Sequence, residues 1–156
     1  MQLYLESVKT FNKLVDLSMT VSQLSAVSAQ TIAYRTMFMQ HGAATPRWQE
    51  NEAQTMTLEK VDAAQAGSQV LWKGWVEMNQ SILAACQKNI RRSNNIDFPA
   101  APIDLISTQS QIMKVTEACA IDGFKLSNEI IDTLKKSIKP AYSYAAGNAN
   151  RLSVKK

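Results

Sequence analysis

The chain has 156 residues, of which 46% are hydrophobic and only 19% are charged, with a net charge of +4. Its size fits one domain. No stretch approaches the roughly 18 uninterrupted apolar residues that a membrane span needs, and the start "QLYLESVKTF" lacks the charged end and apolar run of a secretory signal. These features exclude a spanning protein, and we expect a soluble, cytoplasmic one.

The positive charge is concentrated near the C-terminus. Residues 1–132 hold 11 basic and 13 acidic side chains, whereas residues 133–156 hold six basic ones and no acid. The six are Lys135, Lys136, Lys139, Arg151, Lys155 and Lys156. This charge could bind nucleic acid or another anionic surface. It could equally be a solvated end whose first lysines complement a helix C-terminus.

The first predicted helix covers residues 2–41. Leu14, Leu17, Val21 and Leu24 recur at steps of three and four, which is the spacing of an apolar helical stripe. Serine and alanine occupy much of the later surface of this helix. A core built partly from such small residues is loosely specified, so we expect the helices to find partners in another subunit of a homo-oligomer.

The segment "HGAATPRW" predicts a corner between two helices. Gly42 suits the position after a helix end, Thr45 an N-cap, and Pro46 the first helical turn. The pattern Met37-x-Met39-x-His41 contains soft ligands for Cu(I). Residues two apart on a helix point about 200° away from each other, however. We therefore interpret the methionines as packing residues and predict no metal site.

The second predicted helix covers residues 46–93, and Gly67 and Gly74 predict a bend or a division within it. Its main apolar feature is the cluster around "LWKGW". Trp72 and Trp75 lie on one face, and this cluster either packs between helices or forms an adhesive patch for an apolar surface. The apolar positions are Leu71, Trp72, Trp75, Met78, Ile82 and Leu83.

The third predicted helix covers residues 102–138, with Phe124, Ile131 and Leu134 on its apolar stripe. Pro140 should stop it, because proline has no backbone N–H and clashes with the preceding turn. The sequence therefore predicts an all-α fold: an elongated antiparallel bundle of three long amphipathic helices, coiled-coil-like and without a sheet. Residues 1–139 would form this domain, and residues 140–156 a basic flexible tail.

Residues that could carry chemistry are scattered. The sole histidine, His41, has no candidate catalytic partner close in sequence, and nucleophile-elbow, phosphate-loop and zinc-protease motifs are absent. Cys86 and Cys119 form no CxxC pair and are interpreted as small buried thiols at different levels of the bundle, too far apart for a disulfide. We predict a protein that is not an enzyme and has no cofactor.

The segments "SAQTIAYRTMFM" (28–39) and "TMTLEKVDAAQAG" (55–67), on either side of the proline-marked corner, resemble the phasins, bacterial proteins that coat polyhydroxyalkanoate storage granules. The resemblance implies a non-enzymatic, oligomeric, all-helical protein that binds the polymer surface and affects granule size and number. It also implies contacts with polymer synthase or depolymerase. The apolar stripes of all three helices would then be the surface-binding residues.

Two other functions remain open on the sequence alone. The chain could be a helical scaffold or adaptor for protein partners. Less expected is nucleic-acid binding through the basic residues near the C-terminus.

Overall fold

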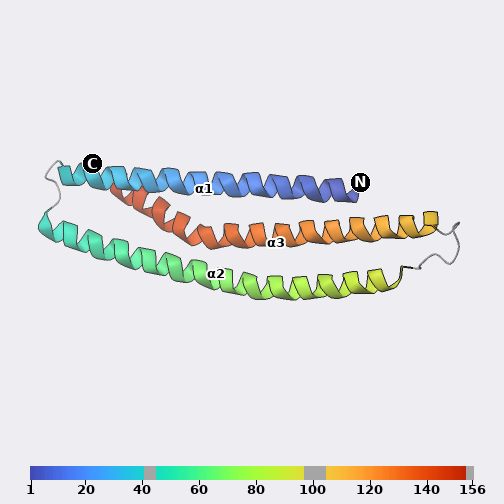
Figure 1. The fold of residues 1–156 in the computed structure, drawn as a ribbon. Coiled ribbons are helices and arrows are strands. Elements are labelled where there is room, and N and C mark those ends of the chain that lie inside the picture. The colour runs from blue at the N-terminus through green and yellow to red at the C-terminus, as the bar shows by residue number, and fades with distance from the viewer. Residues whose placement is uncertain (41–44, 97–104, 154–156) are drawn as a thin grey trace. The chain divides into compact units, whose positions relative to one another are not determined.

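The computed structural model describes residues 1–40, 45–96 and 105–153 and contains three helices, α1 (Gln2–Gln40), α2 (Pro46–Asn94) and α3 (Leu105–Ser153) (Figure 1). The described residues contain no strand, so the predicted all-α three-helix bundle is confirmed. At about 1.5 Å per residue, the helices are roughly 60 to 75 Å long. The predictions for His41, Gly42, residues 102–104, Lys155 and Lys156 lie outside the described residues.

The start of α2 forms as predicted at Thr45 and Pro46. The backbone N–H of Trp48 donates to Thr45 Oγ1 at 3.2 Å, which is an N-cap, and the N–H of Gln49 donates to the Thr45 carbonyl at 3.0 Å. Beside this cap, the rings of Phe38 and Trp48 stack with their centroids 5.8 Å apart. The cap and the ring contact together fix where α1 ends against α2.

The predicted end of the third helix at residue 138 is wrong. α3 continues through Pro140 to Ser153, so residues 140–153 are helical and not a flexible tail. A proline inside a helix costs about 3 kcal/mol. The helix continues because the following turns pack well: Ala149 and Leu152 are buried, and Leu152 is completely so. This packing offsets the lost hydrogen bond.

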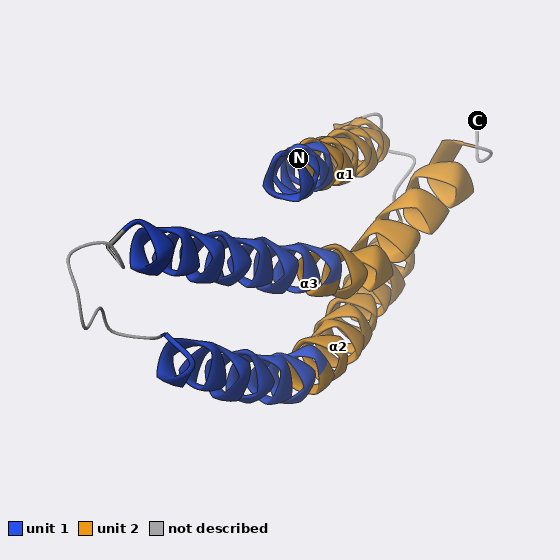
Figure 2. Cartoon of the chain, turned by 90° about the vertical axis from the view of Figure 1, so that its right-hand side faces the viewer, with its two compact units in different colours: residues 1–14, 74–132 blue, residues 15–73, 133–156 orange. Residues whose placement is uncertain are grey.

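The chain divides into two compact units, each containing part of every helix (Figure 2). Unit 1 comprises residues 1–14 and 74–132, and unit 2 comprises residues 15–73 and 133–156. Contacts within a unit give the helix directions. In unit 2, the α2–α3 pairs are 67/137, 59/148 and 52/151, and the α1–α3 pairs are 16/135 and 31/145. α3 therefore runs antiparallel to α2 and parallel to α1 there.

The interior of both units is mostly polar or small. Among the described residues, the buried apolar side chains are Ile121, Ile131, Ala149 and Leu152. The buried polar ones are Thr10, Thr31, Glu52, Thr108, Asp122, Asn128 and Asn148. This composition leaves little apolar burial to hold the helices together. Polar contacts must therefore supply much of the specificity of helix pairing.

Gly67 has a packing role in unit 2. A Cβ atom at this position would lie 2.9 Å from the backbone oxygen of Ser137, so only glycine permits this approach of α2 to α3. Of the predicted bend or division at Gly67 and Gly74, the division is wrong, because one helix runs unbroken from Pro46 to Asn94. The close approach explains why a residue that weakens helices occurs at position 67.

Candidate functional site

Several of the largest apolar side chains of α2 point to solvent, whereas Trp48 at its start stacks on Phe38. Trp72 is 71% exposed, Trp75 is 56% exposed and Leu83 is 63% exposed. The positions of α2 that face its neighbours carry smaller or polar side chains instead, such as Ala63 and Gly67 in unit 2. Trp72 and Trp75 thus contribute little to the interior of either unit. Of the two interpretations of "LWKGW", the exposed patch agrees with the structure.

The thirteen predicted surface-binding residues fall into three groups by exposure. The exposed ones are Leu14, Val21, Leu71, Trp72, Trp75, Ile82, Leu83 and Leu134. Those of intermediate exposure are Leu17, Leu24, Met78 and Phe124. Ile131 is buried in unit 1 and is available to a surface only if that unit opens.

Other exposed apolar residues were not among the predicted candidates. Tyr4, Val8 and Phe11 line the first turns of α1 at steps of four and three, which is a signal the sequence contains. Further large exposed side chains include Leu5, Val15, Met19, Ile32, Leu58, Val61, Ile90, Ile106 and Met113. All three helices therefore carry large apolar side chains that are exposed to solvent.

A buried ion cluster centred on Glu52 holds the three helices of unit 2 together. Glu52, on α2, is 4% exposed. Arg35 of α1 donates from Nε to Glu52 Oε1 at 2.9 Å, and its Nη2 lies 2.8 Å from the same oxygen. From α3, Arg151 donates to both carboxylate oxygens, at 2.8 and 2.9 Å. This fork-like pairing is the strongest geometry available to an arginine and a carboxylate.

The hydrogen bonds between Glu52 and Arg151 shift the pKa of both side chains. Hydrogen bonds from Arg151 are the main reason that the pKa of Glu52 is lowered, and they outweigh the opposing effect of burial. Hydrogen bonding to Glu52 likewise raises the pKa of Arg151. The sequence did not predict this cluster, because the carboxylate and its partner Arg151 lie 99 residues apart and no local motif joins them.

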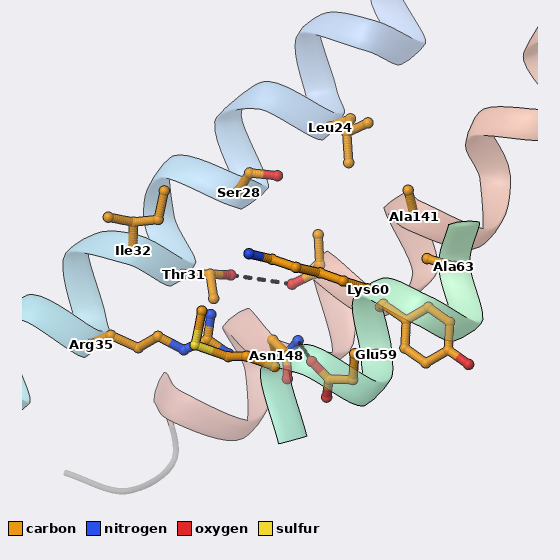
Figure 3. Close-up of a pocket in the computed structure, with 13 residues that line it drawn as sticks. Leu24, Ser28, Thr31, Ile32, Arg35, Glu59, Lys60, Ala63, Ala141 and Asn148 are labelled. Atoms are coloured by element: carbon orange, nitrogen blue, oxygen red, sulfur yellow. Dashed lines mark hydrogen bonds between the residues drawn. The ribbon is translucent and has the colours of Figure 1, made fainter. Parts of the chain in front are cut away.

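Further hydrogen bonds extend the cluster along unit 2. The side-chain amide of Asn148 donates to Glu59 Oε2, and Arg151 Nη2 donates to Asn148 Oδ1 at 3.2 Å. Thr31 Oγ1 also donates to backbone carbonyls, that of Val27 at 3.0 Å and that of Ala145 at 3.3 Å, and the Ala145 contact is the dashed line in Figure 3. A polar layer of this kind is satisfied in one helix register and not in a shifted one, so it selects the register.

Unit 1 has a similar, smaller arrangement. Asp122 of α3 is buried and accepts from Arg92 of α2 at 2.8 Å, with Lys88 Nζ 3.7 Å from its other oxygen. Lys13 of α1 pairs with Asp132. Buried carboxylates thus anchor the helices in each unit separately.

The basic residues near the C-terminus are only partly available to an anionic partner. Arg151 is held by Glu52, and Lys135 pairs with Asp16. Lys136 and Lys139 are exposed. The interpretation of this region as a solvated end is therefore wrong for Arg151, which is half-buried and bound to the buried Glu52.

The two cysteines are both free. Cys86 is exposed, so the expectation of a buried thiol is wrong there, and Cys119 is only half-buried. Within the described residues, no group of three or more His, Cys, Asp or Glu side chains is placed to hold a metal ion. In the same residues, no helix has the length and apolarity to cross a bilayer.

Unit 2 also contains a cavity of about 420 Å³ between its three helices (Figure 3). Leu24 and Ile32 line it from α1, Met56 and Ala63 from α2, and Tyr144 from α3. Its walls are mainly apolar, and Lys60 and Arg35 are among the polar residues at its edge.

Three comparisons bear on which proteins share this arrangement. No family model, no curated protein and no solved structure matches the chain.

Proposed function

We propose that this protein is a phasin-like, non-enzymatic coat protein that adsorbs to the surface of polyhydroxyalkanoate granules in the cytoplasm through the exposed apolar side chains of its helices. It would stabilise granules and affect their size and number. One observation carries the proposal: most of the large apolar side chains are exposed, while most of the buried side chains are small or polar.

The energetics favour adsorption to an apolar phase. Fully burying one Leu, Ile or Val side chain contributes about 1.5–3 kcal/mol, so a side chain that is already 63% exposed, such as Leu83, would contribute roughly 1–2 kcal/mol on contact with polymer. Several such contacts on one helix give strong binding. Exposed apolar side chains that lie close together mark contact sites for a partner, and Trp72 and Trp75, only three residues apart on α2, are both exposed.

The polar interior is compatible with this role. Because Glu52, Asp122 and their arginine partners fix helix pairing without large apolar residues, each unit can keep its fold while its apolar side chains are committed to a surface. The bundle then does not have to open to bind. The sparse basic residues between the exposed apolar ones distinguish this chain from helices that lie on anionic membranes, which are usually rich in Lys and Arg.

The direct experiment measures adsorption of the purified chain to polyhydroxybutyrate particles as salt is raised, with tryptophan emission as a second signal. We expect adsorption to persist in high salt, because apolar contact is not screened, and the emission to shift as Trp72 and Trp75 leave water. Polystyrene particles of equal area are the control for a general apolar surface. Loss of adsorption in moderate salt would contradict the proposal.

A second candidate function is a helical scaffold that uses the same exposed side chains to bind protein. The observation that favours it is the register-fixing polar interior, which presents these side chains in fixed positions. Another copy of the chain is one such partner, and polymer synthase or depolymerase are others. Sedimentation without particles tests self-association. A stable oligomer that never exchanges onto particles would favour the scaffold over the coat.

A further inference from the structure

The cavity of unit 2 has the features of a site for a small ligand, which the granule proposal does not use. Its volume of about 420 Å³ lies within the usual range of ligand pockets, about 300–1,000 Å³. All three helices line it, and the apolar walls come from Leu24, Ile32, Met56 and Ala63. An apolar chain placed there would be enclosed on several sides, unlike one lying on the exposed face of α2.

The polar residues that line the cavity differ in how they are engaged. Arg35 is paired with Glu52, Glu59 accepts from Asn148, and Thr31 donates to backbone carbonyls. Among the charged side chains that line the cavity, Lys60 is different: it is exposed, and its nitrogen makes no ion pair or hydrogen bond with the part of the chain that the structure describes. Figure 3 shows its side chain reaching from α2 toward α1, with the nitrogen at the cavity.

The charges around the cavity leave one positive charge over. Arg35, Lys60 and Arg151 are cationic, and Glu52 and Glu59 are anionic, so three charges minus two leaves +1. Because the arginines are committed to Glu52, the excess charge is located at Lys60. A monovalent anion matches this excess, whereas a dianionic phosphate would need further donors.

We propose that this cavity binds one molecule of a single-chain amphiphile that ends in a carboxylate. The apolar chain lies between Leu24, Ile32 and Ala63, and the carboxylate pairs with Lys60 Nζ at the rim. Two sources share this chemistry: a free fatty acid, and the carboxyl end of a hydroxyalkanoate oligomer. The site would operate whether or not the chain coats granules.

The test is a titration of the full chain with dansyl-labelled undecanoic acid below its micelle concentration, followed by displacement. We expect dodecanoate to displace the probe and its methyl ester to compete up to about fivefold less well, since an ion pair with an exposed lysine contributes at most about 1 kcal/mol. In Lys60→Gln, the acid and the ester should compete equally. Equal competition by both in the native chain would overturn the assignment of the carboxylate.

Matched substitutions separate the cavity from the exposed surface. Ala63→Phe fills the cavity and should abolish probe binding, whereas Ala64→Phe places the same ring at an exposed neighbouring position and should not. If circular dichroism shows that Ala63→Phe does not fold, Ala141→Met is used instead. Its longer side chain enters the cavity from α3 and should likewise abolish probe binding. Probe binding that survives the folded cavity-filling variants would overturn the site and place the acid on the exposed apolar faces.

Two further readouts complete the design. A 3-hydroxybutyrate oligomer with a free carboxyl end is added as a competitor, and displacement by dodecanoate alone or by both identifies which source the cavity accepts. The cavity variants should adsorb to polymer particles like the native chain, because Ala63 and Ala141 are not among the large exposed apolar residues. Failure of the cavity proposal is thereby distinguished from failure of the granule proposal.

Discussion

Leu83→Gln tests the coat-protein proposal at a single side chain. Leu83 lies eleven residues after Trp72, which is about three helical turns, so the two occupy the same face of α2. Since Leu83 is 63% exposed and full burial of a leucine contributes about 1.5–3 kcal/mol, its contact with polymer contributes roughly 1–2 kcal/mol. The substitution should therefore weaken adsorption about five- to thirtyfold.

The assay is an adsorption isotherm on polyhydroxybutyrate particles of known area, with thermal unfolding of the free protein measured alongside. Because Leu83 is largely uncovered, the free energy of unfolding should change by less than about 0.5 kcal/mol. Gln80→Ala, at an exposed polar position of the same helix, is the control and should adsorb normally. Unchanged adsorption of Leu83→Gln, or an equal loss in the control, would refute the reasoning.

Three further predictions concern the interior. Glu52→Gln should lower the free energy of unfolding by about 3 kcal/mol, because it leaves two arginines in unit 2 without their carboxylate. The pKa of Glu52 is lowered in the folded state, so the stability that its carboxylate contributes is fully present above pH 4.5, the ordinary pKa of a glutamate, and is lost as the pH falls through the lower folded pKa. The melting temperatures of the native protein and of Glu52→Gln should therefore converge in acid. A difference that stays constant with pH would contradict this prediction. Gly67→Ala should lower the free energy of unfolding, because its Cβ would lie 2.9 Å from the Ser137 oxygen. Gly147→Ala, whose Cβ would meet nothing within 4 Å, should raise the free energy of unfolding by about 0.5–1 kcal/mol. Chemical denaturation of the two variants measures whether the two changes have opposite signs.

Local signals predicted the helices well. Thr45 and Pro46 placed the start of α2, because capping depends on residues that are adjacent in sequence. Pro140 misled the prediction of α3, since a rule about one residue cannot include the packing of Leu152 twelve positions later. Whether a proline ends a helix depends on how well the residues after it are buried, and this burial cannot be read from the sequence.

Periodicity alone could not predict which way the apolar faces point. A stripe such as Leu71, Trp75 and Ile82 shows that one face is apolar, but not whether that face meets another helix or solvent. Here the contacts between helices fall on small and polar residues, and their pairing depends on partners far apart in the chain, as Glu52 and Arg151 are. The cavity could not be predicted either, because the residues that line it come from three helices that are far apart in the sequence.

The division of the chain has a consequence for biosynthesis. Each unit takes segments from all three helices, and unit 2 needs Arg151 to complete the ion cluster around Glu52. A nascent chain emerging from the ribosome N-terminus first therefore exposes most of its apolar side chains before either unit can close. A premature stop codon before position 151 would release a chain with an incomplete unit 2, so unit 2 can close only after Arg151 has been translated.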